Sequence, residues 1–106
     1  MLKIQANPTF TSRVEIPTPE GPVAIKMVFK HMDTDKYDEF IKREAELKRS
    51  NEDAIMDIAE GWSGVDGDFT RENIAKVCKQ YHAAAGAIVT AFINELTQAK
   101  AGNSAR

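Results

Sequence analysis

The sequence predicts an α+β fold in which an N-terminal β-hairpin is followed by about four α-helices. Two observations lead to this prediction. Apolar and polar side chains alternate over residues 10–16 and again over 23–29, which is the pattern of strands with one buried face. From Thr34 onward the apolar residues recur at spacings of three and four, which is the period of a helix.

The length of 106 residues indicates a single domain over residues 1–106. Within it we expect the hairpin at residues 10–30, a helical part at 34–99 and a flexible tail at 100–106. The segment between the strands contains three prolines and a glycine, which end a strand and permit a turn. A lone hairpin is marginally stable in water, so helices or a strand from another subunit should cover it.

The first helix should begin with Thr34 as its N-cap. Its outer face carries three acid-first pairs at a spacing of four, each of which adds a few tenths of a kcal/mol, at about 0.2–0.5. These pairs are Asp38–Lys42, Glu39–Arg43 and Glu44–Lys48.

A second helix is predicted after Ser50, which forms a pattern resembling a capping box with Asp53. Its inner face should run as far as Trp62, with Gly61 near the end and Gly64 beyond it. The residues of this face are Ala54, Ile55, Ile58, Ala59 and Trp62.

Thr70 is the predicted N-cap of a third helix, and the last helix covers Ala83 to Ala99. The last helix has Glu95 as its single charge. A helix that is apolar nearly all round is either buried or covered by a partner. Self-association is therefore expected.

Composition excludes several classes of function. The formal net charge is −2, and without a basic excess to neutralise phosphates, nucleic-acid binding is disfavoured. Ala83 to Ala99 is short for a membrane span of roughly 20 apolar residues, and the N-terminus has no apolar run of signal-peptide length. A single cysteine, Cys78, fits a reducing cytoplasm. We expect a soluble intracellular protein that uses no cofactor.

A small metal-binding enzyme is the alternative that uses Cys78, His82 and His31. Structural zinc normally takes four protein ligands and catalytic zinc takes three, and beyond Cys78 and His82 the chain has one further cysteine or histidine, His31. Cys78 also lies on the apolar stripe of its helix, where a thiol is usually inert packing, so packing is favoured.

Asp66-Gly67-Asp68 could begin a calcium loop. An EF-hand needs glycine at its sixth position and an acid at its twelfth, and these positions hold Arg71 and Val77. A flexible loop with acids placed ahead of a helix N-terminus is the favoured interpretation.

Residues 33–60 contain ten acids and five bases. Such a surface is mostly a solvated face, and the alternative is a landing site for a basic partner, as in a small regulatory or antitoxin-like adaptor. Trp62 could be a core anchor that closes its loop or a residue of a partner interface, and we favour the core anchor. The small residues Ala83, Ala87 and Ala91 would let another backbone approach the last helix. The candidate partner-binding residues are Trp62, Ile88, Phe92, Ile93 and Leu96.

Several segments resemble, in order, those of the phage tail assembly chaperones of long-tailed bacteriophages and prophages. They are Ile16-Pro17, Val28-Phe29-Lys30-His31, Glu60-Gly61-Trp62-Ser63-Gly64-Val65-Asp66, Phe69-Thr70 with Asn73, Tyr81, Glu95-Leu96-Thr97 and Ala99-Lys100-Ala101-Gly102-Asn103. The resemblance covers residues 10–103 and is most specific around Trp62.

The resemblance implies a non-enzymatic chaperone that binds the tape measure protein and keeps it soluble while the tail tube polymerises around it. It further implies a possible frameshifted form, with a C-terminal extension that recruits the tail tube protein. Such proteins act in the host bacterial cytoplasm and are absent from the mature virion. The family has no catalytic residues to carry over.

Overall fold

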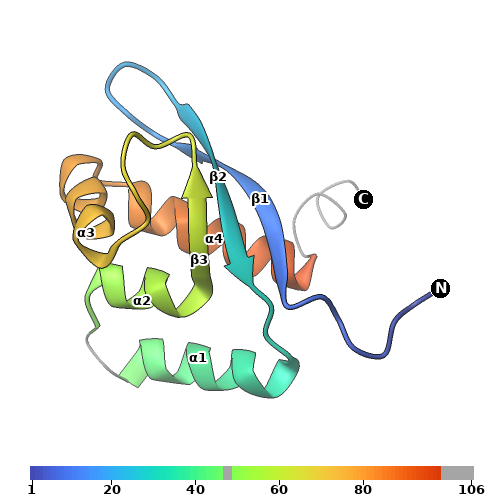
Figure 1. Cartoon of the computed structure of the whole chain (residues 1–106). Helices are drawn as coiled ribbons and strands as arrows, with labels where there is room; N and C mark the ends of the chain where they lie inside the picture. The colour runs from blue at the N-terminus through green and yellow to red at the C-terminus, as the bar shows by residue number, and fades with distance from the viewer. Residues whose placement is uncertain (47–48, 99–106) are drawn as a thin grey trace, which may run out of the picture.

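The computed structural model describes residues 1–46 and 49–98, and it confirms an α+β fold with an N-terminal hairpin and four helices. The elements in order are β1 (Thr9–Ile16), β2 (Val23–Lys30), α1 (Thr34–Glu46), α2 (Asn51–Ile58), β3 (Ala59–Ser63), α3 (Arg71–Gln80) and α4 (Ala84–Thr97). Helix α4 crosses one face of the sheet, and α2 and α3 pack beside it (Figure 1). The predicted tail at 100–106 lies outside the described residues.

Strands β1 and β2 form the predicted antiparallel hairpin, with Phe10 opposite Phe29. In the connecting loop the backbone N–H of Gly21 donates to the Thr18 carbonyl at 2.9 Å. The alternation places Val14 and Ile25 on the buried face, as the period of two requires. The hairpin thus contributes one apolar face to the core.

The third strand, β3, is a correction to the sequence prediction. Helix α2 ends at Ile58, and the segment that was expected to continue it pairs with β2, with Trp62 opposite Met27. A two-stranded hairpin is marginal by itself, and β3 supplies the third strand that it lacks. This pairing outweighs the helical spacing of Ala59 and Trp62, because such spacing is a weak local signal and Gly61 is a poor helix former.

Two of the three predicted helix caps are confirmed. The Ser50 hydroxyl accepts from the Asp53 backbone N–H, and the Thr70 hydroxyl accepts from the Asn73 N–H. For α1 the cap lies one residue earlier than predicted, since the Asp33 carboxylate accepts from the Lys36 N–H at 2.8 Å. Aspartate is as good a cap as threonine, and the sequence offers both in succession.

The ion pairs on α1 also differ from the prediction. Arg43 reaches Asp57 of α2 at 3.1 Å, not Glu39 of its own helix. Glu44 pairs with Arg49 at 3.1 Å, and its predicted partner Lys48 lies outside the described residues. The described part of the chain has no ion pair between Asp38 and Lys42. Exposed pairs are weak, so tertiary neighbours readily replace those at a spacing of four.

Candidate partner-binding surfaces

Ile88 and Phe92 form part of the core, with exposed fractions of 1% and 0%. The Phe92 ring lies among Phe29, Phe10 and Phe40, with ring centroids 5.4, 6.1 and 5.9 Å away. The sheet and α1 therefore already cover the face of α4 on which these two side chains lie. In this fold both side chains pack inside the chain itself, and contact of Ile88 and Phe92 with a partner stays a prediction.

Ile93 and Leu96 are half-buried and pack at the margin of the core. Leu96 borders a shallow pocket of about 310 Å³ between α4 and the start of β1, which Phe10 and His31 also line. Of the predicted residues on α4, these two keep accessible apolar surface. In this fold their apolar surface is open to a partner.

Trp62 is half-buried on β3 and fastens the loop that follows it. Its indole Nε1–H donates to the Gly67 carbonyl at 2.8 Å. Its ring and that of Phe69 lie in a T-shaped arrangement with centroids 5.2 Å apart. The Asn73 amide adds a bond to the Asp68 carbonyl at 2.8 Å. This arrangement supports the loop-closing role that the sequence favoured, and part of the indole remains exposed.

Gly64 lets this loop lie close to the hairpin. Its φ is +86°, a conformation that other residues rarely adopt, and a Cβ atom there would lie 3.4 Å from the Ile25 Cα. Beside it an open pocket of about 320 Å³ is bordered by apolar residues and Asp66. Those apolar residues are Ile16, Val23, Ile25, Val65, Val77 and Tyr81. This pocket is a second shallow apolar surface, and the sequence did not predict it.

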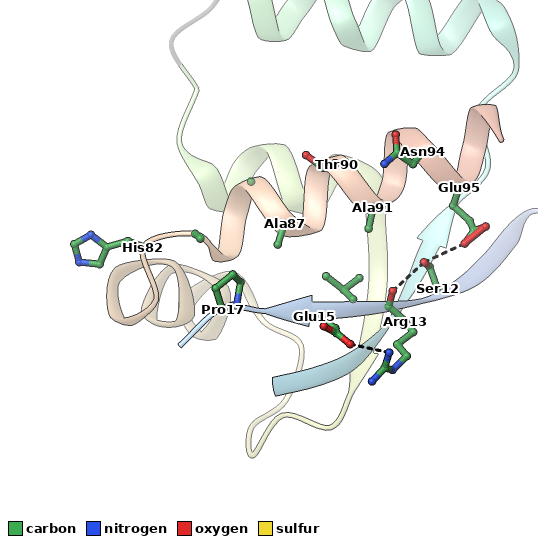
Figure 2. Close-up of a pocket in the computed structure, with 13 residues that line it drawn as sticks. Ser12, Arg13, Glu15, Pro17, His82, Ala87, Thr90, Ala91, Asn94 and Glu95 are labelled. Carbon is green, nitrogen blue, oxygen red and sulfur yellow. Dashed lines mark hydrogen bonds and ion pairs between the residues drawn. The ribbon is translucent and has the colours of Figure 1, made fainter. Parts of the chain in front are cut away.

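A groove of about 620 Å³ lies between β1 and α4 (Figure 2). Ala87 and Ala91 point from α4 toward β1 and leave space beside the strand. Ser12 is buried at one end, where its hydroxyl donates to the Glu95 carboxylate at 3.2 Å. The alanine spacing was the only sequence signal for this groove, because the groove exists only where the strand edge meets the helix.

The acidic face between α1 and α2 is partly neutralised by neighbouring arginines. Arg49 donates to Asp57 and to Glu44. These contacts raise the pKa of Arg49, and the hydrogen bond to Asp57 contributes most. Arg71 of α3 reaches Asp53 at 2.9 Å, and the hydrogen bonds from Arg71 and Ser50 lower the pKa of the Asp53 carboxyl. Three acids of the predicted landing site are therefore engaged in tying helices together.

The residues of the metal-site alternative do not form a cluster. His82 borders the β1–α4 groove, whereas His31 borders the pocket beside Leu96. Among residues 1–46 and 49–98, no group of three or more histidine, cysteine or acidic side chains is placed to hold a metal ion. Cys78 is half-buried, and burial together with the charge of Glu52 raises the pKa of its thiol, which favours the unreactive protonated form.

None of the helices in the described part of the chain is long and apolar enough to cross a membrane. What the described residues offer at the pockets beside Gly64 and Leu96 is shallow surface lined by both apolar and polar side chains, which is compatible with contact to a protein partner. The chain belongs to the phage tail assembly chaperones, because the family model of that description matches residues 1–103. No curated protein and no solved structure gives a significant match.

Proposed function

We propose that this protein binds the tape measure protein of its phage and keeps it soluble during tail assembly, without catalysing a reaction. The family match over residues 1–103 is the observation that carries the proposal. A long amphipathic helix exposes an apolar stripe that aggregates in water, and many small copies of a chaperone can cover it by helix-in-groove contacts.

The C-terminal half of α4 is the surface that we assign to this contact. Leu96 and Ile93 keep apolar area at the surface, and the pocket beside Leu96 can receive a side chain from a partner helix. Phe92 holds α4 in position by packing against Phe29 in the core. Trp62 is a second candidate, because its indole N–H is already bonded within the protein while part of its ring stays exposed.

Three further features belong to the proposal. Copies of the protein associate with one another, which would align several apolar surfaces along one long helix. A longer form made by frameshifting recruits the tail tube protein. The protein acts in the host bacterial cytoplasm and is absent from the mature virion. These features are supported by what the family implies, together with the shallow surfaces described above.

Co-expression with the tape measure protein tests the proposal. We expect the wild-type chaperone to raise the soluble fraction of the long partner, and Leu96→Asp to abolish that gain because it places a charge in the contact. Thr97→Asp is the matched control, since it adds the same charge at the adjacent exposed position.

The unfolding midpoint of each variant is measured in parallel, and Leu96→Ala is a milder replacement if the aspartate unfolds the protein. A partner that is equally soluble with and without the chaperone would contradict the proposal. Equal loss with Leu96→Asp and Thr97→Asp would move the contact away from Leu96.

A further inference from the structure

We propose that residues 1–6 of one copy form a strand on the outer edge of β1 in a second copy and fill the groove between β1 and α4. The inference deepens the self-association proposed above by naming the contact that produces it. It does not depend on binding of the tape measure protein.

The first residues of the chain form an arm with exposed apolar side chains. Leu2 and Ile4 have exposed fractions of 95% and 108%, and the arm runs away from the body of the protein (Figure 1). The two apolar residues alternate with Lys3 and Gln5, which is the pattern of a strand with one face to bury. Large apolar side chains held in water in this way favour association.

The outer edge of β1 can accept such a strand. Among the described residues β1 pairs with β2 alone, so it is an edge strand. The His31 backbone N–H donates to the Pro8 carbonyl at 2.9 Å, which shows that the even-numbered residues of this strand bond to β2. In an antiparallel pair the intervening residues, such as Arg13 and Glu15, then turn their backbone N–H and C=O groups outward. An edge of this kind is a template for another chain.

The groove matches the arm in length and in the size of its side chains. It follows β1 from Ser12 to Pro17, and six residues of strand span about 20 Å. A strand paired there would direct Leu2 and Ile4 toward α4. Gly86, Ala87 and Ala91 leave space on that side, and Figure 2 shows both alanines pointing toward β1.

The charges are also complementary. A strand added at this edge would place Lys3 on the same face of the sheet as Arg13 and Glu15. Glu15 is exposed on this face and pairs with Arg13 at 2.8 Å, so Lys3 would join an existing ion pair beside a carboxylate. The apolar side of the arm thus meets the small residues of α4, and its basic side chain meets an acid.

We assign the arm to a second copy, because a tight type I′ hairpin onto its own β1 is disfavoured. Such a hairpin would turn at Asn7 and Pro8, and a two-residue type I′ turn requires positive φ at both positions. The proline ring holds φ near −65°. The exposed arm and the groove are therefore paired between molecules.

Sedimentation equilibrium of the full chain over a wide concentration range tests this contact. We expect the wild type to associate, and Leu2→Asp with Ile4→Asp to weaken association by about tenfold or more. Gln5→Asp, on the opposite side of the arm, should associate like the wild type. Gly86→Lys should fill the groove and weaken association similarly, whereas Gly86→Ala should leave it intact. A Cβ at Gly86 meets nothing within 4 Å, so the alanine should not disturb the fold, and the unfolding midpoint checks the lysine variant.

Mixing the arm variant with Gly86→Lys provides a further test, because the pair retains one intact arm and one intact groove. We expect the mixture to form a heterodimer that neither variant forms alone. A wild type that is monomeric throughout, or arm variants that associate like the wild type, would overturn the proposal while leaving the co-expression result with Leu96→Asp unaffected. If Gly86→Lys lowers the solubility of the tape measure protein but not self-association, a partner segment occupies the groove and the proposal is also overturned.

Discussion

The two sides of helix α4 differ in the size of their apolar side chains, and the side beside β1 also carries polar residues, namely Thr90, Asn94 and Glu95. The inner side carries Ile88 and Phe92, which are fully buried against the sheet and the other helices. The flank beside β1 carries Gly86, Ala87 and Ala91, which border an open groove. Large apolar residues stabilise the fold, and small ones leave room for another chain.

The same comparison explains how α4 is held. Ala83 stands at its N-terminal cap position and has no polar side chain, whereas α3 begins with the hydroxyl cap of Thr70. The position of α4 therefore depends on the burial of its inner side, at about 1.5–3 kcal/mol for each fully buried large apolar residue. The flank beside β1 is consequently free to change with little cost to folding.

The largest effect is expected on the inner side. Phe92→Ala should lower the free energy of unfolding by about 3–5 kcal/mol, because it leaves a cavity among three other aromatic rings. Denaturant unfolding measures the change, with the exposed Thr90→Ala on the same helix as the control. Equal losses for the two variants would show that Phe92 is not the centre of the core.

Removing the cap of α3 should have a smaller effect. Thr70→Ala leaves the Asn73 backbone N–H without its acceptor and should lower the free energy of unfolding by about 1 kcal/mol. Thr70→Ser should retain most of the stability, since it keeps the hydroxyl. If the alanine variant is as stable as the serine variant in the same unfolding experiment, the hydroxyl does not stabilise α3.

On the flank of α4 beside β1, a substitution should raise the free energy of unfolding instead of lowering it. Gly86→Ala should raise the free energy of unfolding by up to about 1 kcal/mol, because glycine is a poor helix former and the added methyl group meets nothing within 4 Å. Thermal or denaturant unfolding checks this. A loss of stability would mean that the groove is narrower in solution than it is in the structure.

The smallest effect concerns pH. The hydrogen bond from Arg71, with that from Ser50, lowers the pKa of Asp53 in the folded state below its unfolded value of about 3.9. A lowered pKa stabilises the fold above the unfolded pKa, and this contribution disappears as the pH falls through the folded pKa. Wild type should therefore exceed Asp53→Asn in stability near neutral pH and lose that advantage in acid. The pair is exposed, so the difference is small, and a difference that grew in acid would contradict this assignment.

Local signals in the sequence correctly predicted the parts of the fold that they determine. The alternation around Val14 and Ile25 predicted the hairpin, and the hydroxyls of Ser50 and Thr70 predicted two helix starts. The parts that were missed depend on residues distant in sequence. Strand β3 requires pairing with β2, and the groove requires the edge of β1 to meet α4.

The candidate site was predicted only in part for the same reason. Spacing identified α4 as apolar but could not tell that Phe92 lies under other aromatic rings while Leu96 stays at the margin. The sequence alone gives no role to the apolar residues Leu2 and Ile4, because their role depends on the nearby edge of β1. These distinctions arise from tertiary packing.

The central claim is that the inner side of α4 stabilises the fold while the flank beside β1 takes part in self-association. The Gly86→Lys variant tests this claim most directly. Its unfolding midpoint and its sedimentation behaviour are measured in the same buffer as those of the wild type. We predict a midpoint at least equal to that of the wild type, because lysine is a better helix former than glycine, together with self-association weakened by about tenfold or more. A variant that associates as the wild type does, or that unfolds as readily as Phe92→Ala, would contradict the claim.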